Sequence, residues 1–176
     1  MLRLLPIVVL MLGFMAGSAI AQEPVARLIT SSRTVAARTS APVEPNEIEK
    51  RAFDQTNLIR VKKGLPAFTW DADICRMART HSESMSRQAY FSHVTPAGLR
   101  LRDRARAAGI LHFSVLGENI AYTQGYDDPA ALIVQQWMQS SKHRANILST
   151  EFRAMAIGSF VAPDGSIYLT QTFITR

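Results

Sequence analysis

The C-terminal part of the chain carries the pattern that most restricts its fold. Two strand-like segments, 155–161 and 167–175, flank the turn residues Pro163-Asp164-Gly165, as in a β-hairpin. In the second segment, the odd-numbered and the even-numbered side chains would point to opposite faces of the sheet, and both sets are suited to burial. Both faces of this strand therefore need to be covered. Helices on each side of a sheet supply such cover. The sequence therefore predicts an α+β domain with three layers, in which helices flank a small antiparallel sheet.

The segments before this hairpin carry helix signals. Asn46 is suited to cap a helix whose first turn contains Glu47 and Glu49, and Gly64 is suited to end it. A short strand near residues 119–123 is expected to join the sheet. The expected helices run from Asn46 to Lys63, from Asp71 to about Phe91, from about Gly98 to Ala108, and onward from Pro129.

Composition indicates a single globular domain. Of the 176 residues, 47% are hydrophobic and 19% are charged, which is too apolar for a disordered protein. The single cysteine, Cys75, excludes a disulfide scaffold and a thiolate zinc cluster. Its neighbours Ile74 and Met77 lie on an apolar helix face, which favours a buried thiol. A bridge between two chains is the alternative.

The N-terminal segment is typical of an export signal. Residues 1–21 combine Arg3, an apolar run and an Ala19-Ile20-Ala21 cleavage pattern, and we interpret them as a signal peptide rather than an uncleaved membrane anchor. Residues 22–44 have the composition of a flexible linker, and residues 45–176 are expected to form the domain. We therefore expect a periplasmic or extracellular protein, whose formal charge falls from +6 to +5 when Arg3 is removed.

Positive charge is concentrated in one segment. Residues 76–106 contain seven arginines and two acidic residues. Positions 100, 102, 104 and 106 alternate and cannot form one stripe on a helix, which favours a solvated face. Attraction to an anionic envelope surface is the alternative. No nucleic-acid partner is expected, because the chain has an export signal and no nucleic-acid-binding motif.

Three segments carry polar residues that periodicity does not explain. His93 and His143 follow the ends of predicted helices, and Glu118 stands at the start of a predicted strand, positions that often present functional groups on a rigid frame. The segments are Y-F-S-H at 90–93, G-E-N-I-A at 117–121 and W-M-Q-S-S-K-H-R-A-N-I-L at 137–148.

Their order and spacing resemble the CAP superfamily of cysteine-rich secretory proteins, antigen 5 and pathogenesis-related 1 proteins, also called SCP-like domains. The resemblance covers residues 48–174 in the bacterial form, without the disulfides of animal and plant members. It also rests on N-L-I-R at 57–60, L-P-A-F-T-W at 65–70, A-R-T-H-S at 78–82 and Y-L-T-Q-T-F at 168–173.

The resemblance implies an α-β-α sandwich with a surface cleft lined by two histidines and acidic residues. His93, Glu118 and His143 match those positions. Two departures concern the site. Ser140 stands where eukaryotic members often have a second glutamate, and Lys142 stands where many bacterial members have glycine. A cation beside His143 disfavours the charged imidazole or opposes metal binding.

Two imidazoles and one carboxylate form a sufficient ligand set for zinc, with a fourth position left for water. His93, Glu118 and His143 are 25 residues apart in each step, so only folding can bring them together. The alternative is a hydrogen-bonded network that supports the cleft. A tightly held metal is the less favoured outcome, because no third acidic ligand is evident.

Glu118 is chemically suited to general acid–base catalysis with either histidine. No G-x-S-x-G elbow accompanies the nearby serines, so binding is favoured over hydrolysis.

Other polar and aromatic residues are assigned to the scaffold. His81 lies on an apolar helix face and is expected to be a hydrogen-bonded core histidine. Trp70 and Trp137 are expected to anchor the core, and Asn119 and Asn146 to tie loops to the backbone. Gln171 either faces the cleft or serves the sheet.

The sequence thus predicts an exported, non-enzymatic CAP-domain protein that needs no cofactor. Its cleft, formed by His93, Glu118, His143, Ser140 and Gln171, is expected to bind a partner or a hydrophobic, lipid-like, sterol-like or envelope-derived ligand. One alternative is a metal-assisted hydrolase that cleaves peptides or wall fragments, with His93, His143 and Glu118 holding zinc. The other is a structural envelope protein.

Overall fold

The computed structural model describes residues 43–176. The predicted signal peptide, 1–21, and all but the last two residues of the predicted linker, 22–44, lie outside the described residues. Those two residues are attached to the domain. The Val43 carbonyl accepts a hydrogen bond from Trp70 Nε1 at 3.1 Å, and the Glu44 carbonyl accepts one from Arg79 Nη2 at 2.8 Å.

The described residues form five helices and four strands. They are α1 (Glu47–Lys62), β1 (Thr69–Trp70), α2 (Ala72–Arg87), α3 (Leu101–Ala107), β2 (Val115–Thr123), α4 (Pro129–Gln139), α5 (Ser141–Leu148), β3 (Ala154–Val161) and β4 (Ile167–Thr175). Of these elements, β1 and α5 were not predicted. The helix ends follow local signals. Asn46 and Glu49 form a capping box at the start of α1, and the Asp128 side chain accepts a hydrogen bond from Ala131 N at the start of α4.

The strands form one sheet in the order β1-β3-β4-β2. The hairpin partners β3 and β4 are antiparallel, as predicted, and β4 is also antiparallel to β2. The predicted purely antiparallel sheet is in fact mixed, because β1 pairs with β3 in parallel, with Thr69 opposite Ala154. A two-residue strand is too short to show an alternating pattern, and this explains why sequence analysis missed it.

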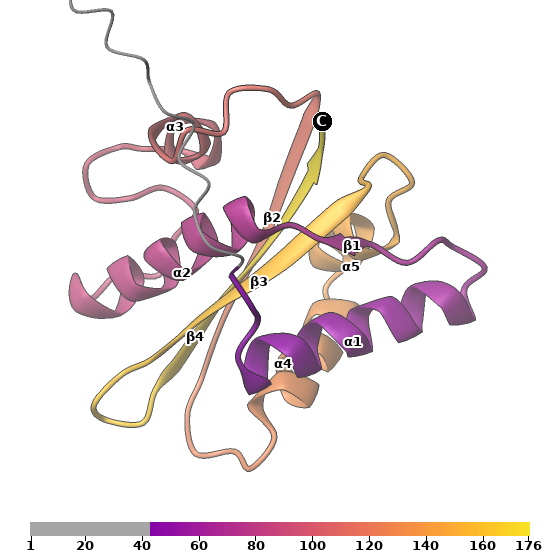
Figure 1. Cartoon of the computed structure of the whole chain (residues 1–176). Coiled ribbons are helices and arrows are strands. Elements are labelled where there is room, and N and C mark those ends of the chain that lie inside the picture. Colours follow the sequence, from indigo (N-terminus) through magenta and orange to yellow (C-terminus); the bar gives the residue numbers. More distant parts are fainter. Residues whose placement is uncertain (1–42) are drawn as a thin grey trace, which may run out of the picture. The chain divides into compact units, whose positions relative to one another are not determined.

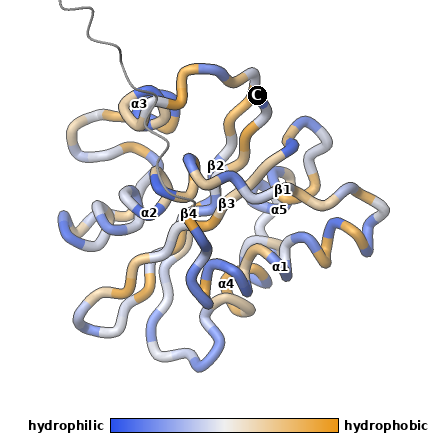
Figure 2. Tube along the Cα trace, in the orientation of Figure 1, coloured by the Kyte–Doolittle hydropathy of each residue, from blue (hydrophilic) through white to orange (hydrophobic). Residues whose placement is uncertain are grey.

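Helices cover both faces of the sheet. Figure 1 shows α1 and α2 on opposite sides of the strands. One core cluster contains residues of α1, α4 and α5 together with Leu169 and Phe173, and a second cluster joins α2 and α3 to Ile174. Hydrophobic residues are prominent along the strands, whereas α1 alternates between hydrophilic and hydrophobic residues (Figure 2). The α-β-α sandwich is confirmed, and alternate residues of β4 serve its two cores.

Three element boundaries differ from the prediction, and two of them move site residues. The chain bends at Ser140 and α5 follows at once, so His143 lies within a helix rather than beyond one. The strand β2 begins at Val115, which places Glu118 within a strand rather than at its start. The helix α2 ends at Arg87, because Ala89 adopts a left-handed conformation with φ of 51°.

Cys75 is fully buried, as predicted, and its thiol faces the Ile157 carbonyl at 3.5 Å. Burial, with a contribution from Glu49, raises the pKa of the thiol to about 12. Because the thiolate is the reactive form, this residue is unsuited to bridging two chains. Among the described residues, no helix has the length and apolar character needed to cross a bilayer.

The helix α2 approaches β3 most closely at Gly158. A Cβ atom at this position would overlap the backbone of Ala78 and Arg79. The same contact is held by the Ser82 hydroxyl, which donates a hydrogen bond to the Gly158 carbonyl at 2.8 Å. The missing side chain at Gly158 therefore sets the distance between this helix and the sheet.

We expect Gly158→Ala to lower the free energy of unfolding by about 3 kcal/mol, because the added methyl group meets backbone that cannot move aside locally. Urea denaturation measures the effect. Val161→Ala is the matched control, since Val161 lies on the same strand with its side chain exposed. Equal stability of the two variants would contradict this account of the helix–sheet contact.

Candidate binding groove and its polar support

His93 and Glu118, two of the three residues predicted to share a cleft, form a direct pair. His93 follows α2 in an irregular segment, and its Nδ1 lies 2.9 Å from Glu118 Oε1. The Glu118 side chain is only 3% exposed, whereas that of His93 is 52% exposed. A carboxylate only accepts hydrogen bonds, so Nδ1 of His93 carries a proton and donates the hydrogen bond to Glu118.

Arg104 of α3 completes this cluster, and sequence analysis missed its role. Its Nη2 lies 2.9 Å from Glu118 Oε1 and 2.8 Å from Oε2, and it also donates to the His93 carbonyl at 3.1 Å. The Arg104 side chain is only 8% exposed. The prediction that the arginines of residues 76–106 form a solvated face is therefore wrong for Arg104. It is also wrong for Arg79, which pairs with the buried Glu49 carboxylate.

Burial by itself would raise the pKa of the Glu118 carboxyl. The hydrogen bond from His93 and the positive charge of Arg104 outweigh burial, and the pKa lies below its usual value of 4.5. A carboxyl group whose pKa is lower in the folded protein than in the unfolded chain stabilises the fold at pH values above its unfolded-state pKa. This stabilisation is lost as the pH falls through the pKa of the group in the folded protein. Glu118 is thus ionised at neutral pH and holds Arg104 and His93 together.

We expect Glu118→Gln to lower the free energy of unfolding by about 3 kcal/mol at pH 7, because it leaves the buried guanidinium of Arg104 without its counter-charge. Chemical denaturation checks this. Glu83→Gln removes one partner of an exposed pair with Arg87 and is expected to cost about 0.5 kcal/mol or less. A Glu118→Gln variant as stable as the Glu83→Gln control would refute a structural role for the buried pair.

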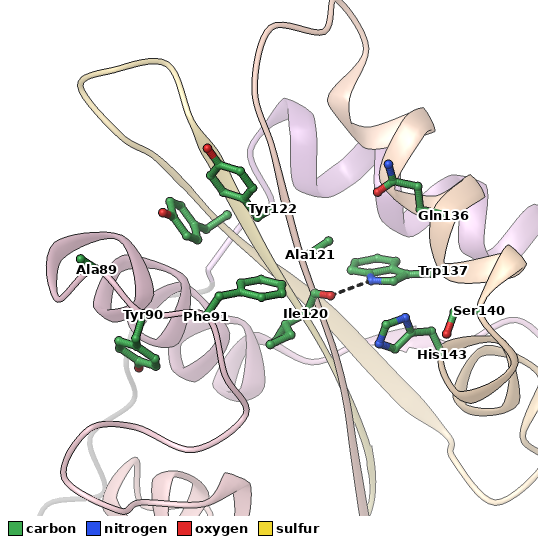
Figure 3. Close-up of a pocket in the computed structure, with 11 residues that line it drawn as sticks. Ala89, Tyr90, Phe91, Ile120, Ala121, Tyr122, Gln136, Trp137, Ser140 and His143 are labelled. Atoms are coloured by element: carbon green, nitrogen blue, oxygen red, sulfur yellow. Dashed lines mark hydrogen bonds between the residues drawn. The ribbon is translucent and has the colours of Figure 1, made fainter.

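A groove of about 690 Å³ lies beside this cluster, and Figure 3 shows the residues that line it. Phe91 faces Trp137 and His143 across Ile120 and Ala121 of β2 (Figure 3). The Trp137 indole donates a hydrogen bond to the Ile120 carbonyl at 3.2 Å, which fixes α4 against the strand. The complete lining is Ala89, Tyr90, Phe91, Ile120, Ala121, Tyr122, Gln136, Trp137, Ser140, His143 and Tyr168.

The structure divides the predicted cleft residues into two groups. His143 and Ser140 line the groove, whereas His93 and Glu118 form the adjacent ion-pair cluster and are not among the lining residues. Burial lowers the pKa of His143, and the nearby His93 lowers it further. The predicted disfavouring of the charged imidazole is correct in direction. Its causes are burial and His93 rather than Lys142.

Gln171 is fully buried and serves the sheet, which was the second of its two predicted roles. Its Oε1 accepts a hydrogen bond from Asn119 Nδ2 at 2.9 Å, and its Nε2 donates to Thr56 Oγ1 at 3.1 Å. Asn119 also donates to the His143 carbonyl at 3.1 Å, and Asn146 donates to the Glu118 carbonyl at 3.2 Å. Both asparagines donate to the backbone as predicted, but they hold α5 against β2 rather than tying loops.

His81 is a core histidine, as predicted, with 1% exposure. Its Nε2 lies 3.0 Å from the Ser92 carbonyl, so this nitrogen carries the proton. Its Nδ1 accepts from the Tyr90 hydroxyl at 3.4 Å, which links α2 to the wall of the groove. Burial and the positive charge of Arg104 lower the pKa of His81 to about 4. The imidazole is therefore neutral in the folded protein at neutral pH.

This lowered pKa makes stability depend on pH. The unfolded chain binds a proton at His81 below about pH 6.5, whereas the folded protein binds it only near pH 4, so stability falls as pH drops through this window. We expect His81→Gln to remove about 2–3 kcal/mol of the difference in unfolding free energy between pH 7.5 and pH 4.5. Urea denaturation at both pH values measures it. An unchanged pH difference in His81→Gln, matching the exposed-site control His112→Gln, would disprove the assignment.

The cluster does not fit the ligand set of a zinc site. The Glu118 carboxylate already accepts hydrogen bonds from Arg104 and His93, and the Arg104 charge beside it opposes a cation. Within residues 43–176, no group of three or more His, Cys, Asp or Glu side chains is arranged to hold a metal ion. In the same residues, neither His93 nor His143 has a ring nitrogen hydrogen-bonded to a serine hydroxyl, which a serine nucleophile requires.

The groove also contains aromatic residues that sequence analysis did not assign to a site. Tyr122 and Tyr168 are register partners on β2 and β4, and their rings lie 5.0 Å apart between centroids. Phe91 and Tyr122 are large aromatic side chains with exposures of 54% and 45%. The one sequence signal for these residues was an aromatic side chain near the end of a predicted strand, where no predicted helix or strand would bury it. The pairing of β2 with β4 was needed to show that the two tyrosines are neighbours.

Known proteins share this architecture. The profile of the cysteine-rich secretory protein family, CAP, matches residues 53–173. The membrane protein YlbC of Bacillus subtilis is 40% identical over 128 residues, which are 73% of this chain and 34% of YlbC. The crystal structure of an extracellular protein with an SCP domain from Bacillus anthracis is 32% identical with a TM-score of 0.65. That match covers 78% of this chain and 45% of the other chain.

A more distant match concerns the fold alone. An outer surface protein of Borrelia burgdorferi superposes with a TM-score of 0.67 at 16% identity, covering 76% of this chain and 96% of that one. The α-β-α sandwich is thus the architecture of an SCP domain. This chain belongs to the cysteine-rich secretory protein family. It spans about a third of the length of YlbC.

Proposed function

We propose that this chain is an exported CAP-domain protein that binds an uncharged, largely apolar envelope molecule, lipid-like or sterol-like, in the groove beside His143. Catalysis is not part of this proposal. Export is supported by the apolar run and Ala19-Ile20-Ala21 pattern at the N-terminus. It is also supported by the extracellular location given for the Bacillus anthracis relative.

The observation that carries the proposal is the lining of the groove. Aromatic and aliphatic side chains dominate it, and none of the described lining residues is an Asp, Glu, Lys or Arg. Binding sites for small molecules combine such an apolar wall with a few polar groups that orient the ligand. A cavity of about 690 Å³ lies within the usual size range of these sites.

The polar groups are placed to orient an uncharged ligand. His143 has a lowered pKa because of burial and is neutral at pH 7, so it offers one donor and one acceptor without a charge. Ser140 and Gln136 add a hydroxyl and an amide on the same wall. Hydroxyl and carbonyl groups of an otherwise apolar molecule match this set.

The supporting cluster favours binding over hydrolysis. The Glu118 carboxylate is held by Arg104 and His93, which gives it a structural use that competes with a role as metal ligand or general acid. A preformed wall with fixed polar groups reduces the entropy lost on ligand binding. The cluster therefore contributes by holding the groove in shape.

We expect the neutral apolar dye Nile red to bind the full chain and to be displaced by cholesterol. Phe91→Ala and Tyr122→Ala should each weaken dye binding about tenfold, because both aromatic side chains line the groove. Fluorescence titration gives the dissociation constants. Leu111→Ala is the matched control, since Leu111 is a large exposed apolar residue outside the groove.

The result expected for the control is an unchanged dissociation constant. If both groove variants bind the dye as tightly as Leu111→Ala does, the groove is not the apolar site and the proposal fails. Circular dichroism of each variant confirms that any loss of binding occurs in a folded protein. Phe91 and Tyr122 are partly exposed, so their truncation leaves the core intact.

A further inference from the structure

A small cavity lies beside the C-terminal end of α1, and it shares no lining residue with the groove. Its volume is about 260 Å³. This is below the usual range of about 300–1,000 Å³ for sites that enclose drug-sized molecules, so the cavity suits an ion or a small polar group. The complete lining is Arg60, Pro66, Ala67, Thr150, Phe152 and Arg153.

Arg60 is a buried cation in the wall of this cavity, with 1% exposure. Its Nε donates to the Pro66 carbonyl at 2.8 Å, and its Nη1 donates to the carbonyls of Ile147 and Ser149 at 2.7 and 2.8 Å. Pro66 and Thr150, which follows Ser149 in the chain, both line the cavity. The guanidinium end of Arg60 lies between these two segments and is therefore the part of the residue that reaches the cavity.

The remaining terminal nitrogen of Arg60 is available to a ligand. Nη2 donates no hydrogen bond within residues 43–176. It is also not one of the unpaired side-chain nitrogens of these residues that are fully shielded from solvent, so it keeps access to the space that Arg60 lines. The centre of the Phe68 ring lies 3.7 Å from the guanidinium carbon, which helps to fix the group. An acceptor at Nη2 would therefore meet a preformed donor.

Arg153 adds a second positive charge to the same wall. Its Nη1 donates to the carbonyls of Thr150 and Phe152, which keeps this exposed side chain beside the cavity. Burial and the nearby charge of Arg153 lower the pKa of Arg60. No Asp or Glu lines the cavity, and neither arginine forms an ion pair in the described part of the chain. Two guanidinium groups thus face one small space without a counter-charge there.

Charge and geometry select the anion. Two positive charges repel each other, and an anion with two negative charges offsets both of them. A carboxylate carries one negative charge, whereas the phosphate group of a monoester carries about 1.5 to 2 at pH 7. Phosphate oxygens also match the planar set of donors on a guanidinium.

We propose that this cavity binds a phosphate dianion, either inorganic phosphate or a small phosphate monoester, held by Arg60 and Arg153. The anion accepts from Nη2 of Arg60, so the three bonds from Arg60 to backbone carbonyls stay in place. It also supplies the counter-charge that the described residues do not give to these two arginines. The site goes beyond the function proposed for the groove and does not depend on it.

Calorimetric titration of the full chain at pH 8 tests the proposal with three probes. We expect saturable binding of one inorganic phosphate or glycerol 3-phosphate, and at least about tenfold weaker binding of dimethyl phosphate, which carries a single charge. The Arg60 Nε–H signal in a proton–nitrogen NMR correlation should shift as the dianion is added. Absence of saturable binding of both dianions, equal affinity for dimethyl phosphate, or an unmoved Arg60 signal overturns the proposal.

The two dianions also distinguish the source of the phosphate group. Glycerol 3-phosphate that binds at least as tightly as inorganic phosphate assigns the site to a phosphate monoester. Weaker binding of glycerol 3-phosphate assigns the site to the free ion.

Variants locate the site. Arg153→Gln should weaken binding of the dianion about tenfold by removing one charge, and Ala67→Glu should weaken it at least as much by placing a carboxylate in the wall. Ala67 is exposed, so its replacement leaves the core intact. Arg106→Gln is the matched control, since Arg106 is an exposed arginine that does not line the cavity. Affinities of Arg153→Gln and Ala67→Glu equal to that of this control would refute the site.

Discussion

The position of β4 is the constraint on which the rest of the structure depends. This strand is hydrogen-bonded to β3 on one edge and β2 on the other, and residues 169–174 are buried. A strand surrounded in this way requires a helical layer on each face. Gly158 lets α2 approach the neighbouring strand on one side, and Trp137 fastens α4 to β2 on the other. The groove lies along β2, the edge strand of the sheet, between α4 and the segment that follows α2.

The buried pair of Arg104 and Glu118 connects the scaffold to function. Glu118 is held within β2, and Arg104 belongs to a short helix that is otherwise anchored by a small apolar cluster. Their contact ties this helix to the sheet and positions His93 through both its ring and its carbonyl. Moving a charged group from water into the protein interior costs free energy, and only close ion-pair and hydrogen-bond partners offset this cost. This explains why the buried Glu118 carboxylate has two donors, Arg104 and His93.

The groove has aromatic residues and a neutral imidazole in its wall, a combination that supports the proposal of an uncharged ligand. The wall of the groove is connected to the α2 side of the sheet through Tyr90 and His81, because Tyr90 lines the groove and its hydroxyl faces the buried His81 imidazole.

Local patterns in the sequence determined α1 to α4, the hairpin and the three-layer class, since caps, turns and alternation act over a few residues, but they did not reveal α5. The order of motifs also identified His93, Glu118 and His143, and the first two are bonded. Tertiary structure alone decided the partner of Glu118, because Arg104 looks like its solvated arginine neighbours until folding buries it. It likewise decided that Gln171 serves the sheet and that Tyr122 meets Tyr168. Such pairings join residues far apart in the chain, and no local signal records them.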